Sequence, residues 1–405
     1  MSLSHHDNRE LEAARERRAE LAERRARFEP VSMVKRMSAK ESAIDAINAF
    51  EARDDRQRLV IAKCRALLVG YDARWLDAGY VPEAVEHTLL SDLYNPDTGG
   101  KSRSFQIAGK LDVTARYLQR RVLIDHKTTS QDIEDPNAPY WRQLVIEGQV
   151  DHYMLLQWLH GEKCDDAVWD VVRKPNISPK KLTKAEIART VSLGDYCGSK
   201  VSKEDQQTFL SGSERETLAM YEARLVKDCT EERPDHYFAR RSVPRIDAEI
   251  LEYSRELWQH SQDILYTRQQ GRLPPRNSGA CLLYGSPCKF LGICSGHDTP
   301  ESDRWQLKQQ IHSELPADIG GDKQLLTNSR IRTFQTCRRK HYYEYDLAIE
   351  RQDEDEKEAL FFGTVFHAGL AAWWSTQLLE VSDDDGNKSP ASGADNDSRH
   401  SEVAR

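Results

Sequence analysis

The stretch "GKLDVTARYLQRRVLIDHKTT", residues 109–129, reads as two strands joined by a short turn, yet it carries charge at the ends of its apolar runs. Asp112 closes the first run, and Asp125 and Lys127 close the second. Side chains of a strand repeat every second residue, so Asp125 and Lys127 share one face. This combination at the rim of a sheet is typical of a site in which two carboxylates hold a metal ion and the lysine lies near a phosphate. The alternative is an ordinary ion pair between residues of edge strands.

The flanking sequence predicts further strands and helices around this pair. "AVEHTLLSDL" (84–93) and "DAVWDVVRK" (166–174) have strand character, and a helix is expected over about 139–160. Additional helices are expected on either side, over residues 40–78, 203–230 and 246–270. Helices that follow strands in this way indicate an α/β (α+β) fold with a mixed central sheet flanked by helices.

Composition narrows the class of protein. The 405 residues are 39% hydrophobic and 31% charged, and no apolar run approaches the roughly 20 residues that span a bilayer. The N-terminal "MSLSHHDNRELEAARERR" has no apolar core typical of a secretory signal, so we expect a cytoplasmic protein without a membrane partner. The net charge of -8 argues against coating of nucleic acid by bulk charge, although a local basic groove is compatible with it.

Eight cysteines in such a chain favour metal ligation over a disulfide framework. Three of them, Cys281, Cys288 and Cys294, lie together in "ACLLYGSPCKFLGIC" (280–294), and Cys337 is available as a fourth ligand. Four thiolates hold a [4Fe–4S] cluster or, by the same geometry, Zn²⁺.

Two basic segments with interleaved aromatic residues are candidates for nucleic-acid contact. "CRRKHYYEY" (337–345) contributes Arg338, Arg339, Lys340 and Tyr342, and "YFARRSVPR" (237–245) contributes the second group, Arg240, Arg241 and Arg245. The alternative is half-buried structure with core tyrosines and solvated basic residues.

Four motifs resemble the PD-(D/E)XK nuclease superfamily in its RecB-like branch of phage and recombination exonucleases. They are "GKLD" ending at Asp112, "IDHKTT" with Asp125 and Lys127, "QVDHY" with Gln149 and Tyr153, and "FGTVFHAGL" with His367. The resemblance implies a restriction-endonuclease-like fold and a Mg²⁺ or Mn²⁺ site formed by Asp112, Asp125 and His367. It further implies that Lys127 assists hydrolysis, that Gln149 and Tyr153 contact DNA or the lysine, and that the four cysteines bind [4Fe–4S].

The order of these motifs departs from the family, in which the histidine helix precedes the strand motifs. The chain therefore resembles a circularly permuted member. An exchange of this segment between two chains, or a reading frame opened inside a circular or tandem gene, would give the same order. The expected organisation is a charged helical extension (1–33), a nuclease core with the three-cysteine loop (34–295), a linker (296–326), a permuted helical segment packed on the core (327–378) and a disordered acidic tail (379–405).

The sequence thus predicts a metal-dependent DNA exonuclease of recombination, repair or phage DNA processing, with DNA and recombination or phage replication proteins as partners. A non-catalytic DNA-binding or recombination subunit with a degenerate nuclease fold is the alternative, favoured by the displaced histidine. An RNA or tRNA nuclease is a third, weaker option.

Overall fold

A computed structural model describes residues 38–352 and 357–384 of the chain. The expected N-terminal extension (1–33) and most of the expected tail, from residue 385 onward, lie outside the described residues. Within them, no helix is both long enough and apolar enough to cross a membrane.

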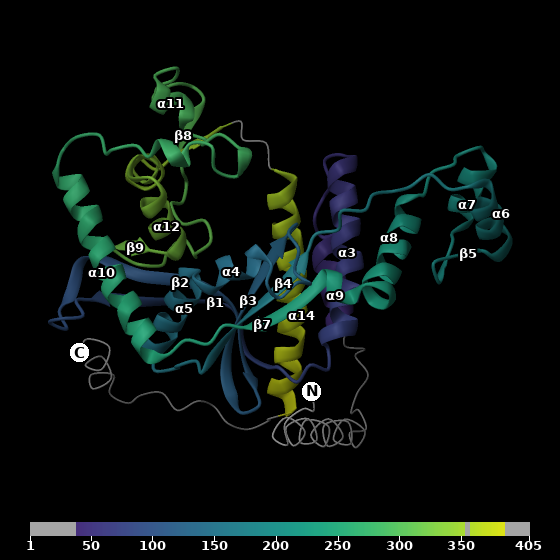
Figure 1. Ribbon diagram of the computed structural model, residues 1–405, viewed down its shortest axis with the longest axis horizontal. Helices are drawn as coiled ribbons and strands as arrows, with labels where there is room; N and C mark the ends of the chain where they lie inside the picture. Colours follow the sequence, from purple (N-terminus) through teal and green to yellow (C-terminus); the bar gives the residue numbers. More distant parts are fainter. Residues whose placement is uncertain (1–37, 353–356, 385–405) are drawn as a thin grey trace.

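A six-stranded mixed sheet forms the centre of the molecule (Figure 1). Its strand order is β1-β2-β3-β4-β7, with β9 paired to β2. The strands are β1 (Val81–Tyr94), β2 (Lys101–Tyr117), β3 (Arg120–Thr129), β4 (Asp166–Arg173), β7 (Phe238–Ser242) and β9 (Gln324–Leu326). Only the β3–β4 and β2–β9 pairs are parallel. The expected mixed α/β architecture is confirmed, and it is compatible with a restriction-endonuclease-like fold.

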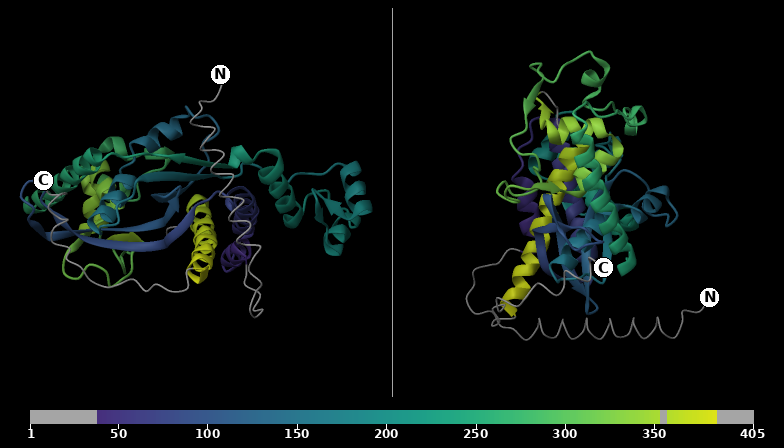
Figure 2. Two further views of the ribbon diagram at one scale, coloured as in Figure 1. Left: turned by 90° about the horizontal axis from the view of Figure 1, so that it is seen from below. Right: turned by 90° about the vertical axis from the view of Figure 1, so that its left-hand side faces the viewer.

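Helices cover both faces of this sheet (Figure 2). On one face lie α2 (Ala39–Asn48), α3 (Asp55–Trp75), α8 (Leu218–Lys227) and α14 (Glu358–Asp384). On the other lie α4 (Pro139–Val145), α5 (Gly148–Leu159), α10 (Asp247–Gln269) and α12 (Asn328–Thr336). Each face has its own apolar core, and β3 supplies both, because Ile124 packs toward α14 while Leu123 packs toward α5.

The single helix expected over about 139–160 is instead two helices, α4 and α5, with a break at Ile146 and Glu147. Consecutive β-branched residues, Val145 and Ile146, followed by Gly148 weaken helix propensity at this point. The break allows α5 to begin at the sheet rim with its own axis, which positions Gln149.

Two smaller units extend from the sheet. One projects at the side and contains α6 (Lys184–Leu193), β5 (Asp195–Tyr196), β6 (Ser199–Lys200) and α7 (Lys203–Leu210) around a small apolar cluster (Figure 1). The other contains α11 (Leu291–Ser295), β8 (Trp305–Leu307), α13 (Arg338–His341) and β10 (Ile349–Arg351). The stretch expected as a linker, 296–326, contributes β8 to this unit and β9 to the central sheet.

Strands β2 and β3 separate part of the way along their length. Their ladder runs from Tyr117 and Arg120 to Val113 and Ile124 and stops there. Beyond that point β2 continues beside β1 and acquires β9 as a parallel neighbour at Phe105–Ile107. The fork between β2 and β3 leaves room for side chains instead of backbone pairing, and the charged residues of the two motifs lie in it.

Candidate active site

Asp112 is the first residue of β2 beyond the end of the β2–β3 ladder. Its Oδ2 accepts a hydrogen bond from the backbone N–H of His126 over 2.7 Å. A side-chain carboxylate therefore takes the place of the strand carbonyl that would otherwise pair with β3. This bond fixes Asp112 relative to the strand that carries Asp125 and Lys127.

Asp125 and Lys127 lie on the α5 side of β3. Asp125 is 2% exposed, and its Oδ2 lies 2.6 Å from the Nζ of Lys127. The ammonium also lies 4.9 Å from the centre of the Trp169 ring, which supports it from β4. The lysine is thus held between a carboxylate and an aromatic face.

Helix α5 continues this chain of contacts. Lys127 Nζ donates to Gln149 Oε1 over 2.6 Å, and Gln149 Nε2 donates to the Tyr153 hydroxyl over 3.0 Å. The four-residue step places Gln149 and Tyr153 on one helical face, as the sequence predicts. Tyr153 packs directly on Gly109, where an added Cβ would approach Tyr153 Cε1 to 2.8 Å, so the glycine of "GKLD" allows the helix to sit close to β2.

Burial raises the pKa of both Asp112 and Asp125 above the usual aspartate range. Lys127 opposes this rise for Asp125, while the negative charge of Asp112 reinforces it. For Asp112 the neighbouring His126 and Lys127 oppose the effect of burial, yet the pKa remains raised. Glu86, a non-glycine residue with φ 49° that pairs with Lys110, also acts to raise the pKa of Asp112.

His367 reaches the sheet from α14. Its ring centre lies 6.1 Å from the ring of His126, and Gly363, one turn earlier, faces Thr128 of β3. Burial, followed by the influence of His126, lowers the pKa of His367 to about 4, whereas Asp125 acts in the opposite direction. The imidazole is consequently neutral near pH 7, the form that binds a metal ion.

The donor chemistry of Asp112, Asp125 and His367 fits a hard divalent ion such as Mg²⁺ or Mn²⁺. Burial disfavours the charged forms of Asp112 and Asp125, and a bound cation would stabilise them. As placed, the described part of the chain does not bring three His, Cys, Asp or Glu side chains into a ready-made metal site. The ammonium of Lys127 is the group that pairs with Asp125 in this arrangement.

A second buried polar cluster lies on the opposite face of the same strands. Asp170 of β4 accepts a hydrogen bond from the Tyr71 hydroxyl over 2.5 Å, and its Oδ2 lies 3.1 Å from Arg240 Nη2 and 3.3 Å from His126 Nδ1. Arg240 is enclosed by aromatic rings, among them Trp75 at 4.4 Å. We call these four residues, Tyr71, His126, Asp170 and Arg240, the buried ion network.

The buried ion network corrects one expectation and reveals one omission. Arg240, which the sequence groups with residues for nucleic-acid contact, has a side chain that is 5% exposed and paired with Asp170, so it does not face a phosphate. The sequence prediction does not include Asp170, although an aspartate inside the apolar run "VWDVV" of a central strand indicates a buried polar partner. Arg241 and Arg245, which follow Arg240 in the chain, contact the Trp141 ring and Asp151, respectively.

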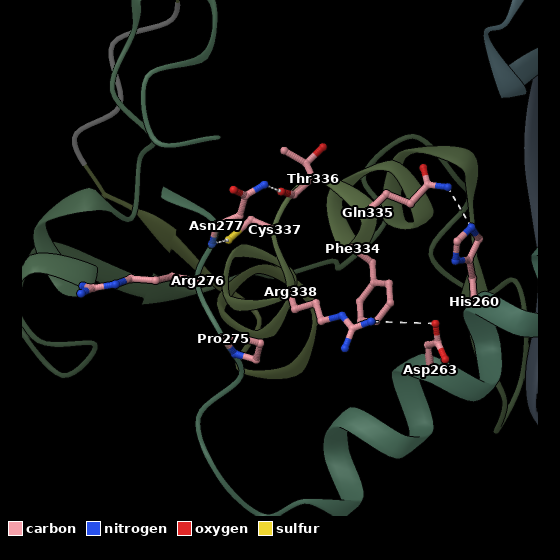
Figure 3. Close-up of a pocket in the computed structure, with 10 residues that line it drawn as sticks. All are labelled: His260, Asp263, Pro275, Arg276, Asn277, Phe334, Gln335, Thr336, Cys337 and Arg338. Carbon is pink, nitrogen blue, oxygen red and sulfur yellow. Dashed lines mark hydrogen bonds and ion pairs between the residues drawn. The ribbon is translucent and has the colours of Figure 1, made fainter. Parts of the chain in front are cut away.

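The four candidate cluster cysteines, Cys281, Cys288, Cys294 and Cys337, line one cavity of about 560 Å³. Figure 3 shows Asn277 beside Cys337, where its backbone N–H donates to Sγ over 3.4 Å and its side chain donates to the Thr336 carbonyl. Burial raises the pKa of Cys294, and the other three thiols act in the same direction. None of the four thiols forms a disulfide, and thiolates are the donors that bind [4Fe–4S] or Zn²⁺, although as placed no three of them form a ready-made metal site.

The basic residues next to Cys337 point in different directions. Arg338 lies over the Phe334 ring and 3.9 Å from Asp263, as Figure 3 shows, and Arg339 Nε donates to the Pro274 carbonyl over 2.7 Å. Lys340 lines the cysteine cavity, whereas Tyr342 lines a neighbouring cavity. Structural contacts thus account for two of these four side chains.

Comparison with known proteins gives one match. A family model described as the PD-(D/E)XK nuclease superfamily matches residues 326–402. This segment includes Cys337 and His367, whereas Asp112, Asp125, Lys127, Gln149 and Tyr153 precede it in the chain. No curated protein and no solved structure matches the chain. The match shows that this segment is similar to PD-(D/E)XK nucleases, enzymes that generally use Mg²⁺ or Mn²⁺.

Proposed function

We propose that this chain is a divalent-metal-dependent DNA exonuclease. The observation that carries the proposal is the continuous chain of contacts from Asp125 through Lys127 and Gln149 to Tyr153, beside Asp112 in the fork of the sheet. The segment that matches the nuclease superfamily adds the neutral imidazole of His367 to the same region. Recombination, repair or phage DNA processing is the setting that the RecB-like motifs favour.

Each residue has a role in this proposal. Asp112, Asp125 and His367 would hold Mg²⁺ or Mn²⁺, which supplies Lewis acidity toward the phosphate and lowers the pKa of water. Lys127 orients the attacking water or stabilises charge on the phosphate. Gln149 fixes the direction of the ammonium through its side-chain carbonyl, and Tyr153 holds the Gln149 amide.

We further propose that the permuted order is accommodated within one chain. Helix α14 packs on α2, with Gly369 so close to Ile47 that an added Cβ would come within 2.8 Å of its Cδ1. A segment packed this closely on the N-terminal helices of the core supports an intramolecular arrangement over an exchange between two chains. In this arrangement His367 of the late helix and Asp112 and Asp125 of the earlier strands would form one site within a single chain, as the family's site residues do.

A [4Fe–4S] cluster bound by the four cysteines is the corresponding proposal for the second unit, with Zn²⁺ as the alternative. The bound group would connect Cys337 at the end of α12 to the loop that carries Cys281, Cys288 and Cys294. Purified protein that is brown and contains iron and sulfide would support the cluster, and colourless protein with one zinc would support Zn²⁺. In either case Cys337→Ala should lower the metal content and make the 276–296 segment more sensitive to protease.

The decisive experiment measures digestion of end-labelled linear DNA and of closed circular DNA with Mg²⁺, Mn²⁺ or EDTA. Asp125→Asn and Lys127→Ala should each reduce the rate on linear DNA by at least roughly 10²-fold while the thermal melt stays cooperative. The matched controls are Asp247→Asn and Lys163→Ala, which break an exposed ion pair of the same 2.6 Å length. Circular DNA without ends should remain intact.

Unchanged digestion by both site variants would end the assignment. DNA binding by the wild type without turnover under any divalent ion would instead support the non-catalytic subunit. Preferential digestion of RNA would move the assignment to a ribonuclease.

A further inference from the structure

A second large cavity lies between α10, β9 and α12, lined by residues other than those of the candidate active site. Its volume is about 850 Å³, within the size range of small-molecule sites. Its walls are formed by the end of α10, by the following turn with Arg272, and by Lys323 together with β9, which begins at the next residue. Arg330 of α12 and Tyr342 complete the lining.

The charge of this cavity is unbalanced. Four cationic side chains line it, and Asp346 is the only carboxylate among its lining residues; the cations are Arg268, Arg272, Lys323 and Arg330. Arg268 Nε donates to Asp346 Oδ1 over 3.0 Å, so this carboxylate is already paired. Lys323 pairs with Asp92, which Lys101 also contacts, so one carboxylate serves two ammonium groups.

Arg330 is the most unusual of the four cations because it is only 2% exposed. Its guanidinium donates to the Leu325 carbonyl over 2.8 Å and to Gln324 Oε1 over 2.7 Å, and its Nε lies 3.2 Å from His341 Nε2. These partners are neutral, since burial and the neighbouring arginines lower the pKa of His341 to about 2. Among the described residues, Arg330 forms no ion pair with a carboxylate.

A buried guanidinium with only neutral partners is costly unless another group supplies negative charge. A guanidinium has five N–H groups, and the three recorded bonds leave donors available. An anion with several acceptor oxygens would satisfy these donors together with those of Arg268, Arg272 and Lys323. Phosphate is the group whose charge and oxygen count fit such an arrangement.

The cavity also has an aromatic side. Tyr342 and Tyr345 line it, and the Tyr345 ring is stacked on His341 at 5.1 Å and is thereby held in place. Tyr342 is half-buried and presents a surface on which a planar ring can lie. Cationic hydrogen-bond donors on one side of the cavity and tyrosine rings on the other suit a ligand that is anionic at one end and planar at the other.

We propose that this cavity binds a nucleoside monophosphate, either free or as the 5′-phosphorylated end of a DNA strand. The phosphate lies among Arg268, Arg272 and Lys323 in the field of Arg330, and the base lies against Tyr342. The site is separate from the Asp112 and Asp125 fork, so the proposal goes beyond nuclease activity and does not require it.

The test is calorimetric titration of the full chain in EDTA, where metal-dependent cleavage cannot contribute. The probes are dAMP, deoxyadenosine, inorganic phosphate, and an oligonucleotide with either a 5′-phosphate or a 5′-hydroxyl. We expect dAMP to bind at least 10-fold more tightly than deoxyadenosine and than phosphate alone, roughly the energy of one charged contact. Binding of the phosphorylated oligonucleotide as tightly as dAMP identifies the strand end as a ligand, and its failure to bind identifies the free nucleotide.

Arg272→Ala and Lys323→Ala, on the exposed side of the cavity, should each weaken dAMP binding at least 5-fold, and together at least 20-fold. Arg189→Ala, an exposed arginine on α6, is the matched control and should bind dAMP as the wild type does. The Arg330→Met variant should lose dAMP binding if the protein folds. If this variant does not fold, Arg272→Ala and Lys323→Ala still test the proposal. Absence of dAMP binding at millimolar concentration, equal affinity in the Arg272→Ala/Lys323→Ala double variant, or equal affinity for phosphate and dAMP would each overturn the proposal.

Discussion

Asp125 and Asp170 are two buried aspartates on adjacent strands of the same sheet, and they have opposite electrostatic environments. They are 2% and 0% exposed, so burial alone would raise the pKa of each. For Asp125 burial prevails over the opposing charge of Lys127, the negative charge of Asp112 adds to the effect of burial, and the pKa is raised. For Asp170 the charges of Arg240 and His126 and the Tyr71 hydroxyl outweigh burial, and the pKa is lowered.

The difference shows what distinguishes a structural charge from a functional one in this molecule. In the buried ion network, every partner of Asp170 is a side chain of the fold itself, so these contacts stabilise the folded state. In the fork, burial keeps the pKa of Asp112 and Asp125 raised despite the nearby cationic groups, so a bound cation would further stabilise their charged forms. Four substitutions or additions test this contrast.

The largest effect is expected from Asp170→Asn. Removing this carboxylate leaves Arg240 buried without its counter-charge, which should lower the free energy of unfolding by roughly 3–5 kcal/mol. Denaturation in urea measures the loss, with Asp247→Asn of the exposed Lys163 pair as a control expected to change stability by less than about 1 kcal/mol. A loss below that of the control would mean that the network is not structural.

The pH dependence of this effect follows from the lowered pKa of Asp170. A carboxylate with a depressed pKa stabilises the fold above its unfolded value of about 3.9, and this contribution is lost as the pH falls through the folded value. Asp170 also raises the pKa of His126, so the difference between wild type and Asp170→Asn should grow as the pH falls from neutral to about pH 6, and narrow only in strong acid. Narrowing at pH 6 would contradict the assignment.

Addition of Mg²⁺ should produce the next largest change. An ion bound only by the folded protein stabilises it by about 2.7 kcal/mol at 100 times its dissociation constant. We expect Mg²⁺ to raise the melting temperature of the wild type and of Tyr71→Phe, but not that of Asp112→Asn. A Mg²⁺ response that persists in Asp112→Asn would place the ion elsewhere.

Tyr71→Phe removes one donor from Asp170 while leaving Arg240 and His126 in place. Because a hydrogen bond to a charged group contributes roughly 1.5–3 kcal/mol, we expect a loss at the lower end of this range. The same denaturation series measures it. Its effect and that of Asp170→Asn should not be additive in the double variant, since the two residues share one interaction.

The smallest change in stability is expected from Asp125→Asn, despite its large effect on cleavage. The substitution relieves repulsion from Asp112, and Lys127 retains its contact with Gln149. In EDTA the free energy of unfolding should stay within about 1 kcal/mol of the wild type or increase. A loss as large as that of Asp170→Asn would show that the two aspartates are not different in kind.

The fork residues were accessible from sequence because the relevant spacings are short. The two-residue step from Asp125 to Lys127 and the four-residue step from Gln149 to Tyr153 each place side chains on one face of a strand or helix. The mixed sheet followed in the same way from the order of strands and helices. The break between α4 and α5 was missed, because a helical pattern continues across it and only the β-branched pair and Gly148 mark the place.

The buried ion network could not be found in this way. Tyr71, Asp170 and Arg240 come from α3, β4 and β7, and no periodicity connects residues so far apart in the chain. Arg240 stands beside Arg241 and Arg245 in "ARRSVPR", and nothing in the sequence separates it from them, so only the packing of β7 beside β4 distinguishes it. The same limit applies to the cavity beside α10, whose cations come from α10, from the turn after it, from the residue before β9 and from α12.

The pairing of β9 with β2 has a consequence for biosynthesis. The β2 segment 105–107 has no β9 partner until residues 324–326 have been synthesised, which happens only after most of the chain has left the ribosome. During that interval β2 exposes an unpaired edge rich in apolar residues, the kind of surface on which nascent chains associate with one another. Production at lower temperature or with a chaperone that shields strand edges should therefore increase the soluble yield of this protein.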